Sequence, residues 1–157
     1  MRIGFGYDVH AFTAGRPLIL GGIEIPYPKG LQGHSDADVL VHAICDALLG
    51  AISEGDIGRH FPDTDPQYKG MRSAVLLKRV VTRLREKRFH IVNIDTTLVC
   101  QRPKLADFIS QMREEIAGVV EVETGRVNVK ATTTEGLGFA GREEGIAAYA
   151  VALVEED

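Results

Sequence analysis

The sequence predicts a two-layer α/β domain of the α+β type, in which helices cover one face of a mixed four-stranded sheet. Segments with strand character alternate with segments of helical periodicity, a pattern that places helices against a sheet. No repeat, low-complexity tract or linker interrupts them, so we expect a single domain over 1–157. The last apolar run, 146–154, shows no alternation, as expected of a strand covered on both sides. Packing of the uncovered sheet face against other subunits would explain that run.

The first half of the chain should form a strand, a hairpin, a helix and a long loop. Two short apolar runs flank Gly21-Gly22, a pattern typical of a hairpin. Ser35 is the candidate N-cap of the helix. The loop contains too many glycines and prolines for regular structure and is long enough to suggest a function. The expected ranges are 3–10, 17–26, 36–53 and 54–70.

The second half should alternate between helices and strands. Apolar residues from Leu76 to Leu84 recur at helical spacing, with basic residues between them. Pro103 ends the strand that precedes it. The expected elements are helices at 73–87 and 105–120 and strands at 89–100, 127–133 and 145–154.

Composition narrows the classes of partner and compartment. A net charge of −4 and a pI near 5.7 argue against nucleic acid and acidic membranes as partners. Cys45 and Cys100 lie in apolar segments and resemble reduced core residues rather than a disulfide framework. We see no signal sequence and no apolar run long enough to span a bilayer, and therefore expect a cytoplasmic protein.

A metal site is the first chemical hypothesis. Asp8 and His10 are separated by one residue of the first strand, so alternation sends both side chains to one face. His42, two turns into the first helix, is the candidate third ligand. An Asp/His/His set leaves one coordination position of zinc open, as in catalytic sites. Each residue alone also fits an ordinary role, as a turn former or a packing histidine. His60 and His90 lack such neighbours, and we expect both to be structural.

Two features of the first helix bear on this site. Asp38, His42 and Asp46 are spaced four residues apart and share one stripe of the helix. Carboxylates beside a ligating imidazole fix its tautomer, so we expect Asp38 or Asp46 to orient His42. Cys45 lies within one turn of His42, and a cysteine-containing zinc site is a competing interpretation, although no second cysteine lies nearby.

The predicted loop over 54–70 is rich in carboxylates. Asp56, Asp63 and Asp65, together with the open backbone at Gly58, suit the binding of polyol hydroxyls. An ordinary solvated loop with aspartates as turn formers is an equally good explanation of this segment alone. The glycine and glutamate that an EF-hand calcium loop requires are missing downstream.

A second polar segment, Thr132-Thr133-Thr134-Glu135, precedes a glycine-rich stretch. Threonine hydroxyls and glycine amides bind phosphate oxygens, and a glutamate beside them can hold a hard cation. Lys104 and Arg142 could supply positive charge for the same anion. Strand propensity alone also explains consecutive threonines. No Gly-Lys-Ser/Thr, kinase or dinucleotide-binding signature is present.

Several segments carry a resemblance that covers nearly the whole chain. They are Asp8-Val9-His10, Gly33-His34-Ser35-Asp36-Ala37-Asp38, His42, Gly55-Asp56-Ile57-Gly58, Phe61-Pro62-Asp63-Thr64-Asp65-Pro66, Pro103-Lys104 and Val129-Lys130-Ala131-Thr132-Thr133-Thr134-Glu135. In this order they resemble the 2-C-methyl-D-erythritol 2,4-cyclodiphosphate synthases of non-mevalonate isoprenoid biosynthesis. The resemblance implies a metal-dependent lyase, a homotrimer with active sites between subunits. It would cyclise 4-diphosphocytidyl-2-C-methyl-D-erythritol 2-phosphate and release CMP.

The resemblance also implies a role for each matching residue. Zinc would be held by Asp8, His10 and His42, and the substrate phosphate would meet His34 and Ser35. The methylerythritol part would lie against Asp56, Ile57, Gly58, Phe61, Asp63 and Asp65. The cytidine and its phosphates would lie against Lys104, Leu105, Ala106, Thr132, Thr133 and Thr134. Glu135 would hold Mg²⁺ or Mn²⁺ between the phosphates. Phe139 would lie at the mouth of a central cavity, and Arg142 would contact a phosphate. His34 and Thr133 would be the catalytic hydrogen-bond donors.

Four residues depart from those common in that family: Phe5, Arg102, Gly136 and Tyr149. None of them is a predicted metal ligand. Two other functional classes remain open at this point. A metal-dependent hydrolase would activate water at the same open zinc position, and a non-catalytic nucleotide-binding trimer would keep the threonine segment but would have no use for the Asp/His/His set.

Overall fold

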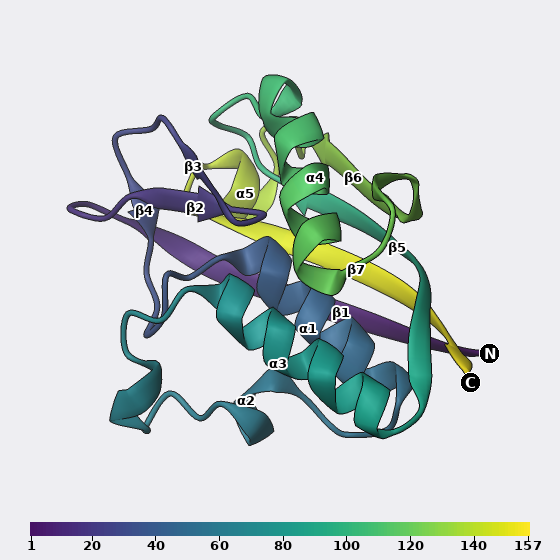
Figure 1. The fold of residues 1–157 in the computed structure, drawn as a ribbon. Helices are drawn as coiled ribbons and strands as arrows, with labels where there is room; N and C mark the ends of the chain where they lie inside the picture. The colour runs from purple at the N-terminus through teal and green to yellow at the C-terminus, as the bar shows by residue number, and fades with distance from the viewer.

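The computed structural model describes residues 1–157 and places the helices on one side of a five-stranded sheet (Figure 1). The strand order is β4-β1-β7-β5-β6, and only β5 and β6 are parallel. The strands are β1 (Arg2–Thr13), β4 (Gly30–Leu31), β5 (Phe89–Val99), β6 (Val127–Thr132) and β7 (Gly145–Glu156). The predicted α+β class with a mixed sheet is confirmed.

The sheet has one strand more than predicted. β4 contains only two residues and pairs with the end of β1, where Phe12 lies opposite Leu31. A two-residue strand is too short to show any periodicity, which is why the sequence did not indicate it. The predicted hairpin is confirmed as β2 (Leu18–Leu20) and β3 (Ile23–Ile25), which form a separate two-stranded sheet. Gly21 and Gly22 both have positive φ, as a type I′ turn requires.

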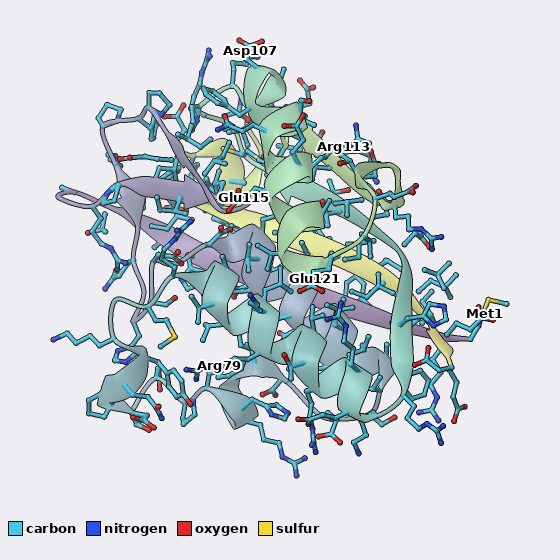
Figure 2. The ribbon with its side chains drawn as sticks, viewed as in Figure 1. Met1, Arg79, Asp107, Arg113, Glu115 and Glu121 are labelled. Carbon is cyan, nitrogen blue, oxygen red and sulfur yellow. The ribbon has the colours of Figure 1, made fainter.

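Three helices form the second layer: α1 (Val39–Ala51), α3 (Ser73–Glu86) and α4 (Ile109–Val120). The helix α1 lies directly against the sheet, and α3 packs on the outer side of α1 (Figure 1). Exposed charged residues such as Arg79 and Glu121 lie on the outer surface of this layer (Figure 2). No helix combines the length and the apolar character that crossing a membrane would need.

The first helix begins later than the sequence predicted. Its N-cap is Asp38, whose side chain accepts a hydrogen bond from the backbone N–H of Val41. Ser35 is not the cap, because Ala37 has a φ of 57° and this left-handed residue separates Ser35 from the helix. The predicted irregular loop contains two short helical turns, α2 (Ile57–His60) and η1 (Pro66–Tyr68). The remaining short elements are η2 (Ala106–Phe108), η3 (Thr124–Arg126) and α5 (Gly138–Gly141).

One face of the sheet, opposite the helices, is uncovered in the single chain. On β7, Tyr149 and Val151 are exposed, whereas Ala148, Ala150 and Ala152 between and beside them are buried. Within the single chain the last strand is therefore covered on one side only, and the expected cover of its other side by neighbouring subunits stays a prediction. The large exposed apolar side chains of this uncovered face are Ile3, Phe5, Tyr7, Val9, Tyr149 and Val151.

Two glycines of β1 allow α1 to pack directly on the strand backbone. A Cβ atom added at Gly4 would lie 1.8 Å from the carbonyl oxygen of Ala47, and one at Gly6 would lie 1.9 Å from that of Ala43. Real Cβ atoms do not approach backbone so closely. The alternation along β1 then continues with Asp8 and His10 on the same, helix-facing side.

Candidate active site

Asp8, His10 and His42 converge at one point between β1 and α1. The Asp8 carboxylate oxygen lies 2.9 Å from Nε2 of His10 and 3.0 Å from Nδ1 of His42. All three donor atoms lie within 4.8 Å of one another, as ligands of one metal ion must. The predicted set of metal-ligating residues is thus brought together, from segments more than thirty residues apart.

The close packing of α1 on β1 explains this convergence. His42 precedes Ala43, whose carbonyl group lies over Gly6, so the helix places the imidazole above the next inward-facing position of β1, which is Asp8. A larger residue at Gly6 would hold the helix away from the strand. The Gly-x-Gly-x-Asp-x-His pattern of residues 4–10 therefore encodes both the helix docking surface and two of the three donors.

The second nitrogen of each imidazole is also occupied. Nδ1 of His10 lies 2.7 Å from the carbonyl oxygen of Gln32, to which it donates. Nε2 of His42 lies 2.8 Å from the hydroxyl of Ser73 and 3.2 Å from that of Ser35. Contacts of this kind fix the ring orientation of metal-bound histidines. A divalent cation therefore fits the chemistry of this donor set.

The three donors also perturb one another electrostatically. Burial acts to raise the pKa of Asp8, but the hydrogen bonds and charges of His10 and His42 outweigh it and lower that pKa to about 2. Burial acts to lower the pKa of His10, and the bond to Asp8 outweighs it, so the net shift is upward. Asp8 consequently stays ionised as the anionic member of the set.

The expected role of Asp38 and Asp46 is wrong. Asp38 is fully buried and accepts hydrogen bonds from the backbone N–H groups of Gly21, Gly22 and Val41. It ties the hairpin turn to the start of α1.

Asp46 accepts a bond from the backbone N–H of Ile57 and so holds the start of α2. Because Asp38 and Asp46 are each four residues from His42, the sequence placed them on one helical stripe with it. Their carboxylates instead accept hydrogen bonds from backbone N–H groups. The alternative site with Cys45 also fails, because that thiol is fully buried and is not among the converging donors.

The metal-ligating residues open into a cavity of about 510 Å³. The loop between α1 and α3 forms its other wall. Of the residues predicted to hold substrate phosphate or methylerythritol, six line this cavity: His34, Ser35, Ile57, Gly58, Phe61 and Asp63. Asp56 and Asp65 do not line it, since each caps a helical turn of the loop, at Arg59 and Gln67 respectively.

The predicted nucleotide residues line a second, smaller cavity of about 180 Å³. It lies where the ends of β5 and β6 meet the start of α4. Lys104, Leu105, Ala106, Thr132 and Thr133 all contribute to its wall. Burial raises the pKa of Cys100, in the same wall, to about 12, so this thiol is not a ready nucleophile.

The segment that follows Thr133 in the chain forms a tight turn. Glu135 has a φ of 53°, and its backbone N–H donates to the hydroxyl of Thr133. Neither Thr134 nor Glu135 lines the cavity wall. Phe139 lies on α5, and Arg142 pairs with Glu144 at 3.1 Å. Neither of these two residues lines either cavity.

The two cavities are separate within one chain and share no lining residue. The strand register shows why. Asp8 lies opposite Ala148, which lies opposite Leu98, which in turn lies opposite Ala131. The metal-ligating strand and the threonine strand are thus three strand spacings apart, or about 14 Å.

Sequence reasoning missed several residues that hold this region in place. Arg16 donates to the carbonyl oxygens of Gly33 and Ser35, both at 2.5 Å, and so fixes the segment that carries His34. Ser73 and Gln32 hold the outer nitrogens of the two imidazoles. The sequence indicated only the helical periodicity over 73–87, which gave no sign that Ser73 contacts His42.

Fold and site define an α+β protein in which a polar cavity adjoins a donor set suited to a divalent cation. The YgbB family model matches residues 1–155, and the chain belongs to this family. A protein of Syntrophobacter fumaroxidans named 2-C-methyl-D-erythritol 2,4-cyclodiphosphate synthase is 64% identical over 157 residues, which cover 100% of this chain and 99% of that protein.

Solved structures of similar proteins have the same fold. The bifunctional IspDF of Campylobacter jejuni matches with a TM-score of 0.96 at 46% identity; the match covers 99% of this chain and 42% of that one, so this chain spans less than half of the bifunctional protein. A 2C-methyl-D-erythritol-2,4-cyclodiphosphate synthase in a CDP-bound form matches with a TM-score of 0.90 at 36% identity, over 98% of this chain and 100% of that one.

Proposed function

We propose that the chain converts 4-diphosphocytidyl-2-C-methyl-D-erythritol 2-phosphate into 2-C-methyl-D-erythritol 2,4-cyclodiphosphate and releases CMP. This is a lyase step of the non-mevalonate route to isoprenoids, and it is the activity after which the 64% identical relative is named. The observation that carries the proposal is the open donor set of Asp8, His10 and His42 at the wall of a polar cavity.

A divalent cation fits the converging donors, and zinc suits one carboxylate and two imidazoles. When bound, such an ion would supply Lewis-acid neutralisation of phosphate charge. The chain's own residues would do the remaining work at this end. Asp8, His10 and His42 hold the ion, and the hydroxyl of Ser35 and the imidazole of His34 line the cavity beside it as hydrogen-bond donors.

The reaction itself needs little acid–base help from the protein. Ring closure joins the 2-phosphate oxygen to the β-phosphorus while the bond to CMP breaks, and the attacking phosphate is already ionised near neutral pH. The chain must therefore overcome charge repulsion and align the two reacting groups. His34 on one side and Thr133 on the other would donate hydrogen bonds to the transition state, and Lys104 would offset charge on the departing CMP.

We further propose that the complete active site lies between two subunits of a homotrimer. The cavity with the metal donors and the cavity with the nucleotide residues are separate in one chain, and the strands that carry Asp8 and Thr132 are about 14 Å apart, measured as strand spacings. A single substrate could instead bridge them if a neighbouring subunit brought its threonine segment to the metal cavity. The uncovered sheet face, with six large exposed apolar side chains, provides a surface for such assembly.

The nucleotide side would bind a second cation. Glu135 is exposed, and its backbone is held in a left-handed turn after Thr134. Its carboxylate is free to share Mg²⁺ or Mn²⁺ with the substrate phosphates. In the same arrangement Phe139 would lie at the central cavity of the trimer, and Arg142 would contact a phosphate after release from Glu144.

Product analysis tests the proposed reaction. The protein is incubated with the cytidine diphosphate-linked substrate and divalent metal, and products are followed by phosphorus NMR together with chromatography of CMP. We expect CMP and a cyclic diphosphate in equal amounts. A linear bisphosphate beside the CMP would instead indicate a hydrolase, and binding of CDP without turnover would indicate a non-catalytic nucleotide-binding protein; either result would overturn the proposal.

A further inference from the structure

The side of His42 that faces away from the metal position is held by a buried serine. Nε2 of His42 lies 2.8 Å from the hydroxyl of Ser73, the first residue of α3. Ser73 is completely buried, so no water competes for this contact. The hydroxyl of Ser35 is farther away, at 3.2 Å, and accepts the backbone N–H of Ala37. Ser73 is therefore the principal partner of this nitrogen.

The partners of Ser73 determine which way the hydrogen bond runs. Its hydroxyl also contacts the carboxylate of Asp36, and an ionised carboxylate can only accept. The single hydroxyl proton of Ser73 must then point to Asp36. The serine oxygen has only lone pairs left for His42, so Nε2 of His42 must carry a proton. In a neutral imidazole this leaves the lone pair on Nδ1, which faces Asp8 and His10.

Asp36 is held in place by backbone groups. Its carboxylate accepts the N–H of Ser73 at 3.0 Å and that of Asp38 at 3.2 Å. Its own N–H donates to the carbonyl oxygen of Met71 at 3.1 Å. The residue before α3, Arg72, makes no capping bond, so Asp36 provides the acceptor for the start of this helix. The carboxylate is thus fixed relative to both α1 and α3.

We propose that Asp36 and Ser73 are positioning residues of the metal centre, which hold His42 as the Nε2–H tautomer and so present Nδ1 to the metal. The proposal rests on the ligand role of His42 in the proposed function. In this proposal the carboxylate that orients His42 is that of Asp36, which acts through Ser73. The carboxylates of Asp38 and Asp46, on the same helical stripe as His42, do not have this role. Such outer contacts of metal-bound histidines are worth about 10–100-fold in metal affinity.

The test measures the tautomer and the metal affinity separately. Ring nitrogens of His42 are observed by NMR in ¹⁵N-histidine-labelled, metal-free protein at about pH 8, where ordinary imidazoles are neutral. Zinc affinity is measured by competition with a coloured chelator. The variants are Ser73→Ala, which removes the acceptor, and Asp36→Asn, whose amide can donate to Ser73 and so free the serine proton to point at His42. The matched control is Ser110→Ala, because Ser110 is an exposed serine whose hydroxyl bonds to the carboxylate of Glu114.

We expect the wild type and Ser110→Ala to show His42 protonated at Nε2. Both test variants should show a mixture of tautomers or the Nδ1–H form, with zinc affinity lowered by about 10–100-fold. Asp36→Asn retains an acceptor for the start of α3, so it keeps the experiment decisive if Ser73→Ala does not fold. Wild-type tautomer and affinity in the folded variants would overturn the proposal. A wild type that binds zinc in this way but releases no CMP would overturn the proposed function and leave this inference standing.

Discussion

Nε2 of His10 and Nδ1 of His42 lie 3.3 Å apart, and both lie within 3.0 Å of one oxygen of Asp8. Because His10 donates its other nitrogen's proton to the carbonyl of Gln32, the nitrogen that faces His42 offers a lone pair when the ring is neutral. Two imidazole nitrogens and a carboxylate oxygen that converge in this way form a donor set that suits a divalent cation.

Removal of one imidazole should empty this site. In His42→Ala, two donors remain and bound zinc should fall from about one per chain to background, with loss of CMP release. Metal content by mass spectrometry of the purified protein is the measurement. His90→Ala is the control, because His90 is half-exposed and pairs with Asp157 far from the donors. Stoichiometric zinc in folded His42→Ala would remove His42 from the ligand set.

The glycine that lets α1 approach β1 should matter for both stability and metal binding. In Gly6→Ala the new Cβ would meet the carbonyl of Ala43 at 1.9 Å, so α1 must move and His42 moves with it. We expect a loss of about 1–3 kcal/mol in the free energy of unfolding, together with weaker zinc binding. Urea unfolding and chelator competition measure the two effects.

Gly118→Ala supplies the matched control for that substitution. Gly118 lies in the last turn of α4, and an added Cβ would meet no atom outside its own helix within 4 Å. Alanine there should stabilise the protein by about 0.5–1 kcal/mol. If Gly6→Ala were as stable as the wild type and bound zinc equally well, the helix docking proposed here would not position His42.

The spacing of apolar residues predicted the long helices and strands well, but it did not predict features that depend on a single backbone conformation or on pairing with another strand. The strand at Phe89–Val99 and the helix at Ser73–Glu86 were each predicted to within a residue or so, because their apolar residues recur at strand or helix spacing. The start of α1 was missed because it depends on one left-handed residue, Ala37, which no periodicity reveals. The two-residue β4 was missed for a similar reason, since its existence depends on pairing with β1.

The metal donors could be found from the sequence because strand alternation and helix placement bring Asp8, His10 and His42 to facing surfaces. Their supporting residues could not. Ser73 lies 31 residues after His42, and only the packing of α3 on α1 brings its hydroxyl to the ring. Asp38 was predicted to lie within the helix, but it is the N-cap, and its side chain accepts from backbone groups of the distant hairpin turn. Such contacts are tertiary, and spacing along one helix carries no information about them.

The buried Asp38 should give stability a distinctive dependence on pH. Burial, together with the charge of Asp36, raises the pKa of Asp38 to about 6 in the folded protein, above its ordinary value of 3.8. The folded state therefore binds this proton more tightly than the unfolded state. The stabilisation is complete below about pH 4 and is lost as pH rises through about 6, a change of up to about 3 kcal/mol.

Comparison with Asp38→Asn isolates this group, because asparagine does not titrate. The free energy of unfolding of the wild type, minus that of Asp38→Asn, should fall between about pH 4 and pH 6 and stay level above that range. Urea unfolding across the range gives both curves. Asp8 acts in a different window, since its pKa of about 2 makes its contribution disappear only on strong acidification. A difference that does not change with pH would show that Asp38 titrates normally in the fold.

The uncovered sheet face should be required for assembly. Val151 is 37% exposed on β7, and a lysine there would place a charge in the proposed contact between subunits. We expect Val151→Lys to lower the mass measured by light scattering from that of a trimer to that of a monomer, and to abolish CMP release. Val75→Lys is the control, because Val75 is 42% exposed on α3, away from this face. A wild type that is an active monomer at micromolar concentration would rule out shared sites.

The central claim is that one active site takes its metal donors from one subunit and its nucleotide residues from another. Complementation tests it most directly. His42→Ala and Glu135→Ala chains, each inactive as a homotrimer, are mixed and allowed to exchange subunits, and CMP and cyclic diphosphate are measured after mixed trimers have been identified by mass. Because some interfaces then carry neither lesion, we predict that activity returns. Mixed trimers that remain as inactive as both parents would contradict the account and would place the complete site within a single chain.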